Sequence, residues 1–351
     1  MTVFGRLKRG VLYLLIGMFG VAGIASILVL FRFWLFLALP ANAARGSLQV
    51  DIQPGMGAVA IGRLLSSKGV VGSARGFYLL CRIRRIGNKL RAGEYVFSSL
   101  STPRQILDQI VNGRVIIHRV TLPEGSTVRD VAKAIERQGL GTEKEIIRLA
   151  QDKAFINTLG LQAPSLEGYL FPETYHFQRN QDGHAILKTM VHTFRLHFSE
   201  MWKKKASETG LSIQNVVIMA SIVEKEAMVD SERPIIAAVF FNRLRLDMPL
   251  QSDPTAIYDL PGFYGTITWS HLKRQSPYNT YFVKGLPAGP ICNPGAKSLK
   301  AVLYPEKVRY LYFVSNNDGT HHFSETIEEH RQAVARYREK RKGGIGESVN
   351  R

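Results

Sequence analysis

Glu224 is the residue whose type and position most clearly suggest chemistry. It lies near the end of residues 211–226, one of the most apolar helical stretches outside the N-terminus. At helical spacing it shares one face with three apolar residues. These are Ile213, Val217 and Ala220. Glu226 follows two positions later, so the helical period directs it roughly to the opposite side.

A carboxyl group on such an apolar face is costly if it is ionised and unpaired. Burial raises the pKa of a carboxyl group, and a raised pKa suits a general acid that works near neutral pH. The sequence therefore predicts Glu224 as a catalytic acid. The alternative is a helix end at which Glu224 forms an ion pair with a nearby Arg or Lys, because structural ion pairs also perturb carboxyl groups.

Residues 250–295 are rich in turns and polar side chains, and long irregular connections in a compact domain are commonly binding surfaces. Polar groups of this kind hydrogen-bond sugar hydroxyls, while aromatic faces pack against pyranose rings. We expect substrate contacts from Gln251, Ser252, Asp253, Tyr278, Asn279 and Tyr281. The alternative for each residue is turn formation, for which Asp253-Pro254 is an ordinary sequence. Asn242 and Arg243 are expected to brace these loops.

Most glycoside hydrolases need two carboxyl groups, about 5 Å apart in retaining enzymes or about 6.5–9.5 Å apart in inverting ones. Glu167, Glu173 and Asp253 are the candidates for a second group. Asp253 is interpreted as a loop organiser or substrate ligand, and Glu167 as a further substrate contact. Glu226 is the least suitable partner because of its helical phase.

Hydrophobic periodicity predicts the elements that position these residues. The predicted helices are residues 183–205, 211–228, 233–246, 298–303 and 327–340. The predicted strands are residues 310–314 and 321–325. His321 and His322 are interpreted as strand residues that neighbours satisfy, since no second ligand cluster lies at a metal-binding spacing. There is no phosphate-binding loop, dinucleotide fingerprint or nucleophile elbow, so neither a metal nor a cofactor is expected.

The N-terminal region predicts a membrane anchor. Residues 11–30 are uninterrupted apolar or small residues, and about 20 such residues span a bilayer. Arg6, Lys8 and Arg9 precede them and no acidic residue occurs before Asp51, which indicates a cytoplasmic N-terminus and an extracytoplasmic remainder. We expect a retained single-pass anchor. Cleavage at residues 41–43, which resemble a signal-peptidase site, is the alternative.

The 351-residue chain is long enough for two or three compact units, and its formal net charge is +18. A charge of this sign suggests nucleic acid, anionic lipid or an acidic polymer as a partner. No zinc-finger spacing or basic stripe interleaved with aromatic residues occurs, so nucleic acid is not expected. Cys81 and Cys292 lie in different predicted domains, and we expect two buried free thiols.

An internal repeat organises the region after the anchor. Residues 50–55 resemble residues 120–125, and the match continues at the same offset through two helices ended by glycine, about residues 56–68 and 128–138. Ser126 and Thr127 are plausible N-caps of the second helix. A basic helix at residues 74–86, a strand at 93–97 and a helix that begins at 101–104 complete the first unit. Such small modules bind glycan chains in cell-wall proteins, although scaffolding alone is the alternative.

Several motifs together resemble the YceG-like (MltG) family of endolytic murein transglycosylases. They are residues 166–175, 220–226, 241–244, 250–255, 278–281, 285–287, 293–295 and 310–314, in the family's order. The likeness covers nearly everything after residue 45 and also the anchor. It implies that the catalytic glutamate is the first of the two in Val-Glu-Lys-Glu, here Glu224, and that a module resembling LysM precedes the catalytic domain.

The resemblance implies an α+β chain with five parts. These are a cytoplasmic tail (1–10), a transmembrane anchor (11–39), a small LysM-like α/β module (45–118), a mixed α+β catalytic domain (119–340) and a basic tail (341–351). The implied location is the inner (cytoplasmic) membrane.

The implied activity is water-free cleavage of the bond between N-acetylmuramic acid and N-acetylglucosamine in nascent glycan strands. The products carry 1,6-anhydro ends and the reaction ends strand growth. Expected partners are peptidoglycan strands, membrane lipids and peptidoglycan synthases. The alternative function is a non-catalytic, membrane-anchored scaffold that binds peptidoglycan and recruits synthases.

Overall fold

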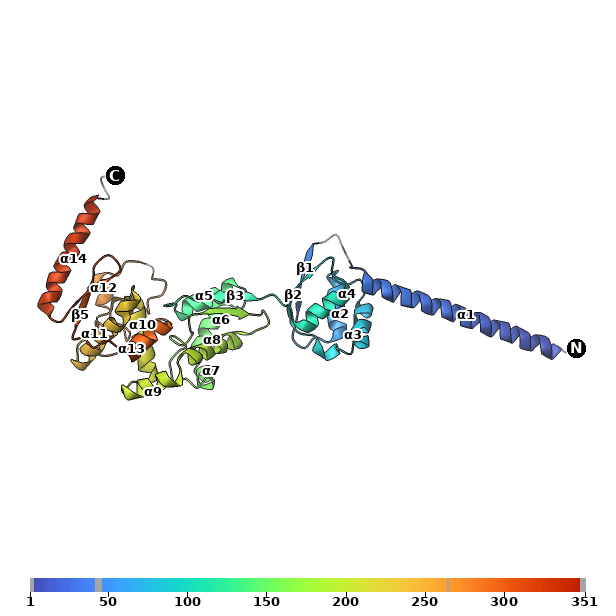
Figure 1. Cartoon of the computed structure of the whole chain (residues 1–351), viewed down its shortest axis with the longest axis horizontal. Helices are drawn as coiled ribbons and strands as arrows, with labels where there is room; N and C mark the ends of the chain where they lie inside the picture. Colours follow the sequence, from blue (N-terminus) through green and yellow to red (C-terminus); the bar gives the residue numbers. More distant parts are fainter. Residues whose placement is uncertain (1–2, 42–45, 264, 348–351) are drawn as a thin grey trace. The chain divides into compact units, whose positions relative to one another are not determined.

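The computed structural model of the chain describes residues 3–41, 46–263 and 265–347, and its architecture is mixed α+β (Figure 1). The chain divides into two compact units. The first comprises Met1–His118 together with Gln178–Asn180, and the second comprises Arg119–Phe177 together with Gln181–Arg351. The strands form three separate two-stranded sheets.

The first unit begins with the long apolar helix α1. Its further elements, in chain order, are β1 (Ser47–Ile52), α2 (Ala58–Ser67), α3 (Ala74–Ile83), the 3-10 turn η1 (Gly87–Lys89), β2 (Gly93–Ser98) and α4 (Pro103–Asn112). Helix α1 covers Val3–Ala38, and its segment Leu12–Ala38 has a mean hydropathy of 2.6 and is long and apolar enough to cross a membrane. The predicted cleavage site at 41–43 extends outside the described residues.

A small core holds the rest of the first unit together. β1 and β2 pair in antiparallel register, with Val50 opposite Tyr95. Helices α2, α3 and α4 bury apolar side chains against this ribbon. The largest are Ile61, Leu65, Phe77, Ile106, Leu107 and Ile110. Because two strands alone are marginally stable, the three helices supply most of the burial.

The second unit contains three strands of its own, ten further α-helices and two 3-10 turns within the part of the chain that the structure describes, and it also includes most of β3. Its elements are β3 (His118–Thr121), α5 (Val128–Arg137), α6 (Glu143–Ala150), α7 (Lys153–Thr158), β4 (Thr174–Phe177), α8 (Gly183–His197), α9 (Glu200–Glu208), α10 (Ile213–Glu226), η2 (Asp230–Glu232), α11 (Arg233–Arg245), η3 (Asp253–Ala256), α12 (Trp269–Leu272), α13 (Ala296–Leu303), β5 (Tyr312–Ser315), β6 (His321–Ser324) and α14 (Ile327–Glu347).

The internal repeat is confirmed as a local pattern. In both copies a strand runs into a glycine turn with positive φ, at Gly55 (84°) and Gly125 (77°), and a helix follows. A residue without a side chain adopts this left-handed conformation without strain. Thr127 caps the second helix by accepting a hydrogen bond from the backbone N–H of Asp130.

Several predicted boundaries are wrong by a few residues, and one helix is two. The segment 183–205 breaks after His197, because the hydroxyl of Ser199 accepts a hydrogen bond from the N–H of Trp202 and caps a new helix. Helix α10 ends at Glu226 rather than Met228, and α14 continues past residue 340 to Glu347. The last four residues of the predicted basic tail lie outside the described ones. Cys81 and Cys292 are both free and buried, as expected.

Helix α10 is the centre of the second unit. All eight residues from Val216 to Val223 are buried, and the helix packs against α11 and α13. This middle part of the helix is therefore buried on every side rather than along one stripe. The two glutamates at the end of the helix contact protein groups in different directions, while Lys225 between them is exposed.

Candidate active site

Glu224 is paired, as in the structural alternative drawn from the sequence. Its side chain is only 5% exposed, and Arg233 Nη1 donates a hydrogen bond to its Oε1 at 2.9 Å. The backbone N–H of Gly295 donates to its Oε2 at 2.8 Å. The expectation of an unpaired carboxyl group on an apolar face is therefore wrong, because η2 and α11 bring a guanidinium back to the end of α10.

Arg233 ties this carboxylate into a wider network. Its Nη1 also donates to Ser298 Oγ at 2.5 Å, and its Nε donates to Asp230 at 3.0 Å. Glu124 lies close enough that, after its own desolvation, the charge of Glu224 raises the pKa of Glu124. With both oxygens engaged, Glu224 links α10 to α11 and to the start of α13.

Glu226 faces the loop that the sequence analysis assigned to substrate. Ser252 Oγ donates a hydrogen bond to Glu226 Oε1 at 2.5 Å. The prediction from helical phase that Glu226 points to a different side of the helix from Glu224 is confirmed, and it is on the side of Glu226 that the loop assigned to substrate approaches α10. Desolvation raises the pKa of this half-buried carboxyl group to about 7, although the bond from Ser252 opposes that shift. The charge of Asp253 raises the pKa further and that of Arg243 lowers it.

The two predicted binding segments, 251–253 and 278–281, are joined by direct contacts. The N–H of Gln251 donates to Thr280 O at 3.1 Å, and the N–H of Ser252 donates to Thr280 Oγ1 at 2.9 Å. Tyr281 Oη donates to Asp253 Oδ1 at 2.5 Å. Gln251 and Asp253 remain exposed, so a carboxyl group of raised pKa adjoins exposed amide and carboxylate groups.

Arg243 contacts the same loop from inside the protein. Its Nη1 donates to the carbonyls of Pro249 (3.1 Å) and Leu250 (3.0 Å) and to Gln251 Oε1 (3.3 Å). Its Nε donates to Leu311 O at 2.7 Å. The amide of Asn242 instead donates to the carbonyls of Val308 and Tyr310, at 3.0 and 2.8 Å. The fork of Arg243 therefore fixes the segment that carries Ser252.

Glu167 and Tyr278, two of the predicted substrate residues, make contacts away from Glu226. Glu167 is 3% exposed and accepts hydrogen bonds from the N–H of Val128 at 3.0 Å and from Tyr258 Oη at 2.8 Å, while burial raises its pKa to about 7. The ring of Tyr258 packs against that of Tyr278 at 4.7 Å. Glu167 thus holds the start of α5.

Asn279 and Glu173 have local contacts. The Asn279 amide donates to the carbonyls of Leu272 and Arg274, at 2.9 and 2.7 Å, and its side chain is fully buried. Glu173 is exposed and accepts a hydrogen bond from the N–H of Thr174. Asn279 therefore organises its own loop in this structure, and the turn-forming alternative applies to it.

Sequence reasoning missed Arg233, Gly295 and Asn293. Asn293 Oδ1 accepts from the N–H of Leu170 and its amide donates to Ser126 O, which joins three distant segments. The sequence carries a signal for one of these contacts only: Arg233 follows Glu224 after a short turn, so it can fold back to form an ion pair with it. Their partners are far apart in sequence, so no local pattern reveals them.

No group of three or more potential metal ligands occurs among the described residues. The N–H of His321 donates to Glu232 Oε1 at 2.9 Å, and its ring contacts the other carboxylate oxygen at 2.7 Å. The interpretation of a strand histidine satisfied by a neighbour is confirmed for His321, whereas His322 is exposed.

Comparisons with known proteins agree with this architecture. A family model described as the YceG-like family matches residues 50–336. An endolytic murein transglycosylase of Bacillus subtilis (strain 168) is 31% identical over 310 residues, which cover 84% of this chain and 86% of that protein. One of Streptococcus pneumoniae serotype 2 is 26% identical over 86% of this chain, which spans 60% of that longer relative. The crystal structure of a YceG-like protein from Listeria monocytogenes superposes with a TM-score of 0.58 at 32% identity, covering 82% of this chain and 98% of that one.

Proposed function

Because this chain belongs to the YceG-like family, we propose that it is an endolytic murein transglycosylase whose acid is Glu226. It cleaves the bond between N-acetylmuramic acid and N-acetylglucosamine and leaves 1,6-anhydro ends, which makes it a carbon–oxygen lyase that acts on a polysaccharide. The observation that carries the residue assignment is the contact between Ser252 and Glu226, since it puts a carboxyl group with a pKa of about 7 beside the polar loop.

One carboxyl group serves both steps. Neutral Glu226 donates its proton to the glycosidic oxygen, and the bond from that oxygen to C1 breaks with its electron pair. An oxocarbenium-like centre remains on the muramoyl sugar. The Glu226 carboxylate then takes the proton of the C6 hydroxyl as that oxygen bonds to C1 of its own ring. The attack is intramolecular, so much of its entropic cost is removed in advance.

The residues around Glu226 have matching roles in this proposal. Desolvation keeps a large fraction of Glu226 protonated near neutral pH, and the charge of Asp253 adds to that effect. Gln251 and Asp253 are exposed and offer hydrogen bonds to sugar hydroxyl and acetamido groups. Arg243 holds the loop from inside, as a positioning residue. Away from Glu226, Tyr278 packs against Tyr258 and offers a partly exposed ring to a sugar face.

Glu224 is the rival assignment, because the family resemblance points to the first glutamate of the pair. An acid must reach the glycosidic oxygen of its substrate, and both oxygens of Glu224 are already engaged inside the protein. Arg233 bonds one oxygen of Glu224 and Gly295 the other. We therefore assign Glu224 a positioning role, and the paired variants described in the Discussion separate the two glutamates.

A second carboxylate would allow hydrolysis instead, and Asp253 is the candidate whose charge acts on Glu226. Glu167 is committed to Val128 and Tyr258 inside the protein. Asp253 adjoins Glu226 but is engaged by Tyr281. The water-free reaction needs no second base, and it is the one we propose.

The N-terminal half supports a location for this reaction. The apolar helix fits a single-pass anchor. We propose that it lies in the inner (cytoplasmic) membrane with the N-terminus in the cytoplasm, so that the catalytic unit meets nascent strands outside. Basic residues near the membrane surface favour anionic headgroups by about 1 kcal/mol each. We propose that the 45–118 module is LysM-like and binds glycan, and that synthases are partners. The non-catalytic scaffold is not favoured, because the named relatives are transglycosylases.

Product chemistry tests the activity. The purified full-length chain is incubated with un-crosslinked glycan strands, and the new ends are analysed by mass spectrometry before and after borohydride treatment. The proposal predicts anhydro ends, which borohydride does not reduce. New ends that gain two hydrogens on reduction would show that water was the acceptor and would reject the lyase reaction.

A further inference from the structure

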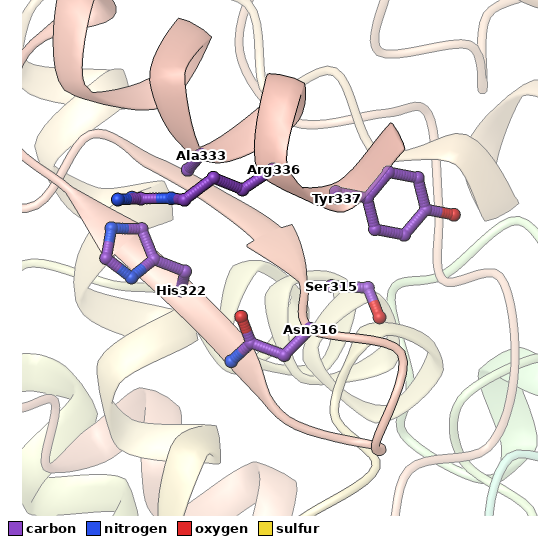
Figure 2. Close-up of a pocket in the computed structure, with 6 residues that line it drawn as sticks. All are labelled: Ser315, Asn316, His322, Ala333, Arg336 and Tyr337. Atoms are coloured by element: carbon purple, nitrogen blue, oxygen red, sulfur yellow. The ribbon is translucent and has the colours of Figure 1, made fainter. Parts of the chain in front are cut away.

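A cavity of about 250 Å³ lies between the β5–β6 hairpin and helix α14, away from the contacts of Glu226 (Figure 2). Its lining residues are Ser315, Asn316, His322, Ala333, Arg336 and Tyr337. Figure 2 shows the guanidinium of Arg336 reaching across to the ring of His322, with the amide of Asn316 below them. Arg336 comes from α14 and the other two from the hairpin.

The electrostatics of this cavity favour an anion. None of the six lining residues is acidic. Within the described part of the chain, neither Arg336 nor His322 is joined to a carboxylate by an ion pair, whereas the adjacent His321 contacts Glu232. Successive strand residues face opposite sides of a hairpin, so His321 is held against the protein while His322 is available to a ligand.

The hairpin that carries the cavity is held in place before any ligand arrives. Arg243 Nε donates to the carbonyl of Leu311 just before β5, and His321 fixes β6 to Glu232. Asn316 Nδ2 donates to Thr320 Oγ1 at 3.0 Å. This bond uses one side of the Asn316 amide and leaves its Oδ1 without a donor among the described residues. Preorganised groups lose little entropy when they bind.

The polar side chains that line the cavity complement the carboxylate and the last backbone N–H at the C-terminal end of a peptide. A guanidinium fork pairs with a planar carboxylate through two parallel hydrogen bonds. An imidazole adds a further donor, and the free Asn316 Oδ1 accepts from a backbone N–H. The methyl group of Ala333 and the ring of Tyr337 are apolar neighbours suited to a small side chain. A cavity bounded by a hairpin and a helix suits a chain end better than a flat membrane surface, and the exposed His322 and Arg336 leave it open to solvent.

We propose that this cavity binds the terminal carboxylate of a peptide stem attached to the glycan, through Arg336, His322 and Asn316. The inference rests on the proposed function for its substrate, because murein is a glycan that carries peptides. It adds a site for the peptide part that is separate from the site for sugar, so that the enzyme discriminates strands by their stems as well as by their glycosidic bonds.

Binding of a defined peptide tests the proposal directly. The full-length chain in a neutral detergent is titrated into a fluorescently labelled pentapeptide that ends in Ala-Ala with a free carboxylate, and into the same peptide with a terminal amide. The wild type is expected to bind the acid at least tenfold more tightly than the amide. Arg336→Gln is expected to remove that difference, and His322→Gln to reduce it. Arg331→Gln is the matched control, since Arg331 is an exposed residue of α14 that does not line the cavity.

Equal binding of acid and amide by the wild type would overturn the proposal, as would an unchanged preference in Arg336→Gln or an equal loss in Arg331→Gln. Vesicles that contain phosphatidylglycerol form a second arm. If they bind through Arg336 while the acid peptide does not, the cavity takes a lipid phosphate instead.

The readout is binding, so it is independent of cleavage. A chain that binds the acid peptide through Arg336 but cuts no glycan would reject the proposed function and keep this site. A chain that cuts glycan but binds the acid and the amide peptide equally would keep the proposed function and reject this site.

Discussion

Ser252 donates a hydrogen bond to Glu226, and through this contact the loop after α11 meets the end of α10, whose residues 216–223 are all buried. The loop is held beside Glu226 because Arg243 donates to the carbonyl of Leu250 and Thr280 Oγ1 accepts from the N–H of Ser252. Glu224, two residues earlier in the helix, is held by the guanidinium of Arg233 instead. The two glutamates thus have different environments, and their variants should behave differently.

The pH dependence of cleavage should report Glu226. Its pKa of about 7 means that the acid form is depleted as the pH rises through that value. We expect kcat/KM to decline by about tenfold per pH unit above roughly pH 7. A rate profile on purified glycan between pH 5 and 9 measures this decline. A profile that stays flat to pH 9 would rule out a carboxylic acid of this pKa.

Asp253 should set the position of that decline. Its negative charge raises the pKa of Glu226, so Asp253→Asn should lower that pKa and move the alkaline limb to lower pH. Tyr281→Phe is the control, because it removes the hydrogen bond to Asp253 but leaves the charge. An alkaline limb that does not move in Asp253→Asn, or that moves equally in both variants, contradicts the electrostatic role.

Glu224→Gln should chiefly reduce stability. Removal of the Glu224 charge leaves Arg233 with only the exposed Asp230 as a charged partner, and breaking a buried pair costs about 3 kcal/mol. The Glu224→Gln/Arg233→Gln double variant should lose less than the sum of the two single variants. Urea unfolding of the purified chain measures these free energies, and cleavage per folded molecule should persist in Glu224→Gln. Strict additivity would mean that the ion pair contributes no coupling.

Glu167 should make stability depend on pH. Burial raises its pKa in the folded state to about 7, above the ordinary value of 4.5, so the folded state holds its proton more tightly. Its contribution is therefore fully present below about pH 4.5 and is lost as the pH rises through about 7. Glu167→Gln should flatten the fall of unfolding free energy across this window. Glu226 titrates in the same range, so part of the slope should remain, and an unchanged slope would contradict the assignment to Glu167.

Arg243→Lys should weaken both the fold and the rate. A lysine cannot reproduce the fork that contacts the carbonyls of Pro249, Leu250 and Leu311, and a buried unsatisfied carbonyl costs about 1–3 kcal/mol. Arg245→Lys is the control, because Arg245 is exposed on the same helix, and it should lower the free energy of unfolding by under about 0.5 kcal/mol. Thermal unfolding and kcat/KM are measured for both. Equal effects of the two substitutions would show that the loop contacts of Arg243 have no special role.

Much of the fold follows from local sequence. Apolar periodicity and capping residues predict most helices to within a few residues, and the repeat of 50–55 at 120–125 corresponds to two strand–turn–helix copies. The break at Ser199 was missed because the helical pattern continues across it, and only the cap shows where a new axis begins. Strand partners and the short helix α12 depend on contacts between distant segments.

The sequence predicted which loop residues lie near the end of α10, but not which of its two glutamates they contact. The polar loop residues 251–253 do lie against a helix-end glutamate, yet helical phase selected the wrong one for this contact. Phase identifies a buried face only when a helix has a solvent face, and α10 has none along residues 216–223. The ion pair of Glu224 depends on the turn η2, which brings Arg233 back to the end of α10, and local propensity does not predict the path of that turn.

Digestion of peptidoglycan by Glu226→Gln beside Glu224→Gln tests the central assignment most directly. Both variants are purified at full length and their folded fraction is measured, and the muropeptides that they release are quantified by mass spectrometry. The account predicts that Glu226→Gln folds and forms no anhydro products, while Glu224→Gln, corrected for its folded fraction, still forms them. Normal anhydro products from Glu226→Gln, with none from folded Glu224→Gln, would contradict it and return the catalytic role to Glu224.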